Sequence, residues 1–130
     1  MESVRVMLVD DHQVVRTGIK VYLESQPQIQ VVGEAGTGEE ALELISALKP
    51  DVVVMDITMP GMGGIEATRQ LSAQYPACHV LILTVHADPQ YFFEMMAAGA
   101  TGYVTKQAAA DELLEAIRTV SRGQVYLQPA

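Results

Sequence analysis

The sequence has few cysteines, which form the disulfides of secreted proteins, and few of the basic residues that bind nucleic acid. Cys78 is its single cysteine, so no disulfide can form within the chain, which fits a reducing compartment. Its 8 lysines and arginines are scattered and are outnumbered by 16 acidic residues, for a net charge of −8. That balance excludes a basic nucleic-acid footprint and disfavours an anionic membrane surface. Because no apolar run approaches the ~20 residues that span a bilayer, we expect a cytoplasmic protein with no membrane partner.

Short apolar runs alternate with helical patterns along the chain. Its 130 residues, 49% of them apolar, suit one domain with a sizeable hydrophobic core. Five runs predict buried strands: Val4–Val9, Val31–Val32 with its polar flanks, Val52–Met55, Val80–Leu83 and Gly102–Val104. Helical patterns fill the gaps, and Thr37 and Asp88 are placed as helix caps. The alternation predicts an α/β protein with a flavodoxin-like, doubly wound (βα)5 fold, a three-layer sandwich whose parallel sheet has the order 2-1-3-4-5.

Polar side chains stand where four of the predicted strands end. Asp10 and Asp11 follow the first strand, Asp56 the third and Thr84 the fourth, and Lys106 comes two residues after the fifth. The carboxyl ends of parallel strands meet at one edge of the sheet, where such folds bind ligands. Three carboxylates gathered there repel one another, and a divalent cation relieves that repulsion. Oxygen ligands suit Mg²⁺, which often completes its shell with phosphate oxygens.

The same residues can support phosphoryl transfer. Asp56 is a carboxylate nucleophile able to form an acyl phosphate, while Lys106 neutralises charge and Thr84 donates a hydrogen bond. Taken singly these residues are ordinary, since Asp11 could be a helix cap and Lys106 a surface lysine. Their joint placement at the strand ends favours the functional interpretation. Cys78 is assigned no catalytic role, because it lies at the opposite end of the fourth strand.

The five positions resemble, in order and spacing, those of bacterial response-regulator receivers, and the similarity covers roughly residues 4–123. The resemblance implies that Asp11, Asp56 and the backbone carbonyl of Thr58 bind Mg²⁺, with Asp10 assisting. It also implies that a sensor histidine kinase, or a small acyl phosphate, phosphorylates Asp56. Such a protein is not an enzyme toward other molecules, because it catalyses only its own aspartyl phosphorylation and dephosphorylation.

The resemblance assigns roles to residues around the phosphoacceptor as well. Thr84 and Tyr103 would be the switch residues, the Tyr103 ring moving inward as Thr84 reaches the phosphoryl group. The alternative for Tyr103 is a tyrosine half-buried in an edge strand, with no switching role. Thr58 and His86, each two residues past a site residue, would tune the lifetime of the phosphoryl group.

Several stretches are similar to one subgroup, the NarL/FixJ (LuxR-type) regulators. They are Val9–His12, Leu83–His86, Gly99–Lys106 and Gly123–Leu127, and Gln107 stands where many receivers have proline. Such regulators usually control transcription through a C-terminal helix-turn-helix domain that binds DNA. We therefore interpret residues 1–123 as the receiver domain and residues 124–130 as a tail that begins a linker. A phosphorylation-dependent homodimer is expected, through either the helix 4–strand 5–helix 5 face or the helix 1–helix 5 face.

Other functions of this fold stay open at the level of sequence. Flavodoxins bind FMN through a Ser/Thr-rich loop after the first strand, where Asp10–Gln13 would repel phosphate without a metal. Phosphatases of the haloacid-dehalogenase type need a second acid where this chain has Thr58. The nearest alternative is a stand-alone or degenerate receiver that acts as a protein-interaction module. Neither His12, which can cap or pack against the first helix, nor His79 is assigned a metal.

Overall fold

The computed structural model describes residues 3–57, 59–85, 89–106 and 110–127. Strands and helices alternate along these ranges as predicted, and a further strand follows them. The strands are β1 (Val4–Val9), β2 (Ile29–Ala35), β3 (Val52–Met55), β4 (His79–Thr84), β5 (Gly102–Thr105) and β6 (Tyr126–Leu127). The helices are α1 (Gln13–Glu24), α2 (Gly38–Leu48), α3 (Gly64–Gln74), α4 (Pro89–Ala98) and α5 (Ala110–Ser121).

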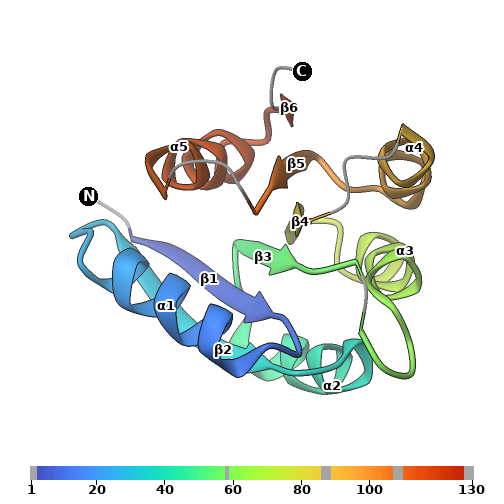
Figure 1. Cartoon of the computed structure of the whole chain (residues 1–130), viewed down its shortest axis with the longest axis horizontal. Coiled ribbons are helices and arrows are strands. Elements are labelled where there is room, and N and C mark those ends of the chain that lie inside the picture. Colours follow the sequence, from blue (N-terminus) through green and yellow to red (C-terminus); the bar gives the residue numbers. More distant parts are fainter. Residues whose placement is uncertain (1–2, 58, 86–88, 107–109, 128–130) are drawn as a thin grey trace.

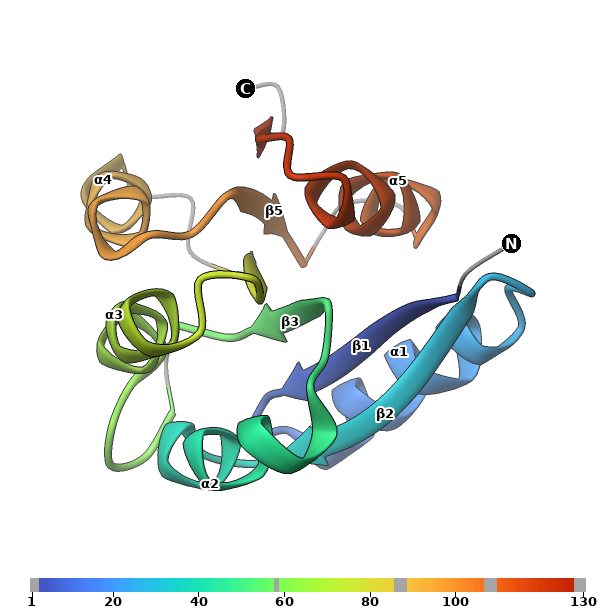
Figure 2. The same ribbon diagram turned by 180° about the vertical axis from the view of Figure 1, so that it is seen from behind.

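All the strands belong to one parallel sheet with the order β2-β1-β3-β4-β5-β6. Its first five places confirm the predicted order 2-1-3-4-5. Helices α1 and α5 cover one face of the sheet, and α2, α3 and α4 cover the other (Figure 1). Figure 2 shows the same three layers from behind. Because every strand runs the same way, all of their carboxyl ends lie at a single edge of the sheet.

Strand side chains alternate between two apolar layers, one on each face of the sheet. Val9 and Met55 point into the layer shared with α2, α3 and α4, whereas Leu8 and Val54 point toward α1 and α5. Burial on both faces explains why these strands are continuous apolar runs in the sequence. It also explains why each run stops where the strand leaves the core.

The structure differs from the sequence prediction at the two edges of the sheet. β2 extends well beyond Val31–Val32, because on an edge strand polar residues such as Gln30 can face solvent. At the other edge, Tyr126–Leu127 pairs with β5 as a sixth strand, within the segment expected to be a tail. A strand of 2 residues is too short to have the periodicity by which strands are predicted.

The helices begin close to where their sequence patterns predict. The Thr37 hydroxyl accepts a hydrogen bond from the backbone N–H of Glu40 at 3.1 Å, which confirms the predicted cap of α2. The Glu40 carboxylate in turn accepts one from the backbone N–H of Gly36 at 3.1 Å. Asp88, the other predicted cap, lies outside the described residues. None of the helices described here has the length and apolar character needed to cross a membrane.

Candidate functional site

The strand ends bring together the polar residues identified in the sequence. Asp10 directly follows β1, Asp56 follows β3, Thr84 ends β4 and Lys106 follows β5. Asp10, Asp56 and Thr84 are only 5%, 4% and 0% exposed, whereas Asp11 is exposed to solvent. The edge therefore combines buried carboxylates, fixed by the sheet, with one that is accessible from outside.

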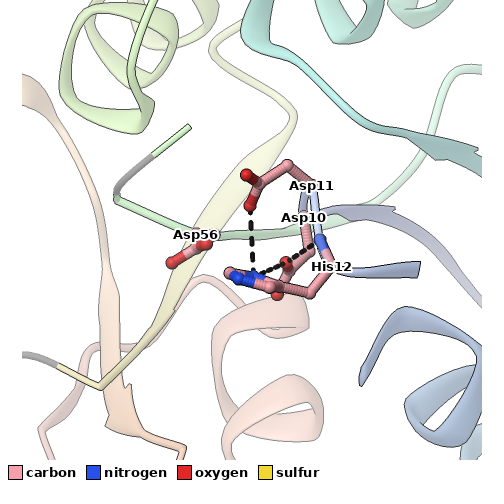
Figure 3. A group of neighbouring side chains, drawn as sticks. All are labelled: Asp10, Asp11, His12 and Asp56. Carbon is pink, nitrogen blue, oxygen red and sulfur yellow. Dashed lines mark hydrogen bonds and ion pairs between the residues drawn. The ribbon is translucent and has the colours of Figure 1, made fainter. Parts of the chain in front are cut away.

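Three carboxylates and one imidazole form a single cluster (Figure 3). Asp10, Asp11, His12 and Asp56 each offer a ligand atom, and these atoms lie within 4.8 Å of one another. His12 Nδ1 lies 3.1 Å from Asp10 Oδ1 and 3.2 Å from Asp11 Oδ1. His12 occupies the N-cap position of α1, yet its side chain makes no capping hydrogen bond and faces the acids instead. No pattern in the sequence predicted this contact, although His12 directly follows the two aspartates.

Lys106 contacts both buried carboxylates. Its Nζ lies 2.8 Å from Asp10 Oδ2 and 3.5 Å from Asp56 Oδ2, and its side chain is 14% exposed. The backbone N–H of Lys106 donates to the carbonyl oxygen of Thr84 at 2.7 Å, which ties the ends of β5 and β4 together. One ammonium thus contacts two of the three carboxylates in the cluster, those of Asp10 and Asp56, so the three acids outnumber their lysine partner.

Burial raises the pKa of the Asp56 carboxyl above its ordinary value of 3.8, and the neighbouring Asp10 charge adds to the rise. Lys106 and a hydrogen bond from the backbone of Ile57 act on the same pKa in the opposite direction. Burial is the largest of these influences, so the ionised carboxylate lies in an environment that disfavours its charge. A divalent cation at this edge would stabilise it, and the all-oxygen donors of the aspartates suit such an ion.

The connection from β3 to α3 packs directly against the main chain of Asp56. A Cβ added at Gly64 would lie 1.9 Å from the Asp56 carbonyl oxygen, so only glycine fits there without a backbone shift. The backbone N–H of Gly64 also donates to the carbonyl of Ile57 at 2.8 Å. The start of α3 therefore fixes the backbone from which the Asp56 side chain projects.

Two charged residues that the sequence analysis did not identify hold the loops around the cluster. A carboxylate oxygen of Glu39, in the first turn of α2, accepts the backbone N–H of Met62 at 3.1 Å. Arg16 of α1 donates from Nε to Glu34 Oε1 at 2.9 Å and also to the carbonyl oxygen of Asp10. Glu39 and Met62 lie 23 residues apart in the chain, and Arg16 and Glu34 lie 18 apart, so no local pattern could have revealed these two contacts.

Tyr103 points inward from β5. Its side chain is 8% exposed, and its ring centroid lies 5.3 Å from that of Phe92 in α4 at an interplanar angle of 79°. This is the edge-to-face arrangement that aromatic pairs favour. The alternative of a half-buried tyrosine in an edge strand is wrong, because β6 lies outside β5 and Tyr103 is buried.

Three further predicted residues lie away from this cluster or beyond the described ranges. Thr58 and His86 fall outside the described residues. Cys78 is buried just before β4, at the opposite end of that strand from Thr84. Burial raises the pKa of the Cys78 thiol to about 12, with a smaller contribution from Asp51. A thiol that ionises so weakly is a poor nucleophile, in keeping with the absence of an assigned catalytic role.

A doubly wound parallel sheet with acids, a hydroxyl and a lysine at its carboxyl edge defines the class: an α/β protein with a polar site where the strands end. The chain matches the response regulator receiver domain family over residues 6–118 and belongs to that family. It is therefore a receiver domain of the two-component response regulators, as the sequence motifs predict.

Similar proteins place the chain among the LuxR/NarL regulators. It is 48% identical over 126 residues to the response regulator GacA of Pseudomonas aeruginosa, covering 97% of this chain and 59% of the relative. It is 41% identical over 127 residues to the transcriptional regulatory protein DegU of Brevibacillus brevis, covering 98% and 54%. The solved structure of a LuxR-family two-component response regulator from Aurantimonas sp. SI85-9A1 superposes with a TM-score of 0.94 at 42% identity, covering 98% of this chain and 91% of that one. The chain spans between 54% and 59% of the length of these curated relatives.

Proposed function

We propose that Asp56 accepts a phosphoryl group from a sensor histidine kinase, and that the acidic edge binds Mg²⁺ for the transfer. The observation that carries the proposal is the buried Asp56 carboxylate, with a ligand atom within 4.8 Å of those of Asp10 and Asp11. The same carboxylate lies 3.5 Å from the Lys106 ammonium. In this proposal Asp11, Asp56 and the backbone carbonyl of Thr58 bind the metal, and Asp10 assists.

Asp56 acts as the nucleophile of the transfer. A carboxylate oxygen forms a bond to phosphorus while the phosphorus–nitrogen bond to the donor histidine breaks, and the imidazole leaves with its electron pair. Mg²⁺ held by these residues would supply positive charge to the phosphoryl oxygens. Lys106 lies between Asp10 and Asp56 and can turn its ammonium toward a phosphoryl oxygen. The Thr84 hydroxyl, at the end of the adjacent strand, donates a hydrogen bond to another.

Phosphorylation then shifts a two-state equilibrium of the domain. It adds roughly one to two negative charges and new acceptor oxygens at the edge of the sheet. Thr84 moves toward them and the inward position of Tyr103 is favoured, which repacks the surface between β4 and α5. Thr58 and His86 tune how long the phosphoryl group survives.

The output of this switch is control of transcription. One relative, DegU of Brevibacillus brevis, is named a transcriptional regulatory protein, and this chain covers 54% of its length. We therefore propose that residues 1–123 form the receiver, that residues 124–130 begin a linker, and that DNA is bound only through a further domain. In this proposal the protein works in the cytoplasm. It forms a phosphorylation-dependent homodimer through the α4–β5–α5 or the α1–α5 face. It catalyses no reaction other than its own phosphorylation and dephosphorylation.

Intact-mass measurement after incubation with acetyl phosphate and MgCl₂ tests the proposal. The wild-type chain should gain the mass of one phosphoryl group, and Asp56→Asn should gain none. Asp111→Asn, an exposed acid in the first turn of α5, is the matched control and should be modified like the wild type. Asp11→Ala should need far more Mg²⁺ for the same modification. Modification of Asp56→Asn would overturn the assignment of Asp56, and an unmodified wild-type chain would favour a degenerate receiver that only binds proteins.

A further inference from the structure

β6 lies along the outer edge of β5 and continues the sheet. The backbone N–H of Tyr126 donates to the carbonyl oxygen of Thr101 at 2.9 Å. The register pairs Tyr126 with Gly102 and Leu127 with Tyr103. Figures 1 and 2 both show β6 beside β5 and next to α5. The proposed switch tyrosine is therefore the direct strand partner of a residue near the C-terminus.

The Tyr126 side chain anchors β6 on the α5 side of the sheet. Opposed residues on paired strands point to the same face, and Tyr126 stands opposite Gly102, which has no side chain. The Tyr126 ring packs against the apolar layer that α5 shares with the strands. Burial raises the pKa of the Tyr126 phenol, and the acids Glu115, Glu112 and Asp111 of α5 add to the rise, which places the ring beside that helix. β6 is thus held by a backbone hydrogen bond and by a side chain.

Leu127 faces the opposite side of the sheet and stands beside Tyr103. Alternation along the strand puts Leu127 on the α4 side, where the Tyr103 ring packs against Phe92. Phe92 of α4 lies on one side of the Tyr103 ring. Leu127 is 47% exposed and lies along the outer edge of β5. A Tyr103 ring that turned outward to solvent would have to cross this edge. An outward Tyr103 ring would therefore turn toward the side chain of its strand partner Leu127.

We propose that the pairing of β6 with β5 depends on the position of the Tyr103 ring. β6 docks on β5 when the ring is inward and dissociates from it when the ring turns outward. The inference rests on the proposed function, which makes the ring position depend on phosphorylation of Asp56. Phosphorylation then favours the docked β6, and docking fixes the direction in which the chain continues after Leu127. The signal passes from β5 to the C-terminal segment by strand pairing.

The coupling acts in both directions, because linkage between two sites is reciprocal. If an inward Tyr103 favours a docked β6, then a docked β6 favours the inward ring and the phosphorylated state. Removal of β6 pairing must then weaken binding of beryllofluoride, which mimics the phosphoryl group on an aspartate. A strand that merely covers the sheet edge would have no such effect.

Amide hydrogen exchange of the 130-residue chain, followed by NMR in MgCl₂ with and without beryllofluoride, tests the forward direction. The Tyr126 amide should exchange at least about fivefold more slowly with beryllofluoride, a factor at the lower end of typical couplings between sites. The Val31 amide in β2, at the opposite edge of the sheet, should be unchanged.

Beryllofluoride titration of Tyr126→Pro tests the reverse direction. Proline deletes the N–H that bonds Thr101. The variant should need about fivefold more beryllofluoride than the wild type. Val125→Ala changes a neighbouring side chain that is 56% exposed and precedes β6, so it should titrate like the wild type.

The results that would overturn the inference differ in what else they remove. If amides around Asp56 respond to beryllofluoride while Tyr126 exchange stays constant, the proposed function stands and the coupling to β6 is wrong. If no amide near Asp56 responds at all, the proposed function fails and the coupling fails with it. A Tyr126→Pro variant that binds beryllofluoride like the wild type refutes the coupling as well. Equal losses in Tyr126→Pro and Val125→Ala would also overturn it, because the loss would then not depend on the pairing of β6 with β5.

Discussion

Replacing Lys106 by methionine removes the ammonium that faces the two buried carboxylates while keeping most of the side-chain length. Lys106 Nζ lies 2.8 Å from Asp10 Oδ2 and 3.5 Å from Asp56 Oδ2. At an effective dielectric constant of about 20, the Coulomb attraction in each of these two ion pairs is about 5 kcal/mol, before the cost of desolvation is subtracted. Leaving buried charges without their partner usually costs about 3–5 kcal/mol. We expect Lys106→Met to lower the free energy of unfolding by about 3 kcal/mol at pH 7 without added metal.

Urea unfolding followed by circular dichroism measures this loss, and Lys20→Met is the matched control. Lys20 Nζ lies 3.3 Å from Glu34 Oε2, but the Lys20 side chain is 39% exposed, so the control should lose less than about 1 kcal/mol. Lys106 lowers the pKa of Asp56, so its removal should raise that pKa further. When folding raises the pKa of a carboxyl, the stability that this carboxyl contributes to the folded protein is lost as the pH rises through the raised pKa. The deficit of Lys106→Met should therefore grow from acidic pH toward pH 7.

Two results would refute the reasoning. Equal losses for Lys106→Met and Lys20→Met at pH 7 would show that the buried pairing contributes no more than a surface ion pair. A deficit that does not change with pH would show that it comes from lost packing of the lysine stem and not from the carboxylates.

Four other outcomes follow from the same structure. Asp56→Asn removes a charge that burial disfavours, so it should raise the unfolding temperature at pH 7 by a few degrees, about 4 °C per kcal/mol for a domain of this size. The gain should vanish in thermal melts below pH 3.8, the ordinary pKa of the carboxyl. A gain that is the same at all pH values would contradict this reasoning. Gly64→Ala should cost about 2 kcal/mol or more in urea unfolding, because its Cβ would lie 1.9 Å from the Asp56 carbonyl oxygen. Gly18→Ala, with nothing within 4 Å of the added Cβ, should instead stabilise α1 by about 0.5–1 kcal/mol. Cys78, with its pKa raised from 9.0 to about 12, should form roughly a thousandfold less thiolate at pH 8 than an ordinary cysteine, and rapid alkylation by iodoacetamide in the folded chain would contradict this.

The fold and the central residues of the site were predictable because the strands are buried on both faces. Val52–Met55 is a continuous apolar run, and Asp56 follows it at once, so the end of the strand is visible in the sequence. The same holds for Asp10 after β1. Once parallel pairing is inferred, the strand ends must meet at one edge, and the acids with them.

The contacts that support the site were not predictable in this way. The Glu39 carboxylate receives the Met62 amide, and Arg16 binds Glu34, across segments that only the folded chain brings together. Sequence periodicity reports on burial within one element and carries no information on which loops touch. An inward Tyr103 ring was implied by the resemblance, but its contact with Phe92 and the pairing of β6 along β5 were not, because both depend on contacts between separate elements.

The two edges of the sheet differ in how they are protected against pairing with other chains. β2 is a long edge strand whose register is irregular opposite Val6 and Met7, and such irregularities discourage edge-to-edge association. The other edge would be β5, with the apolar Tyr103 and Val104, if the 2-residue β6 did not cover it. The match to the receiver family ends at residue 118, before β6 begins. A domain boundary chosen from that match alone would uncover an apolar strand edge, and the shortened protein should aggregate more readily than one that retains Tyr126 and Leu127.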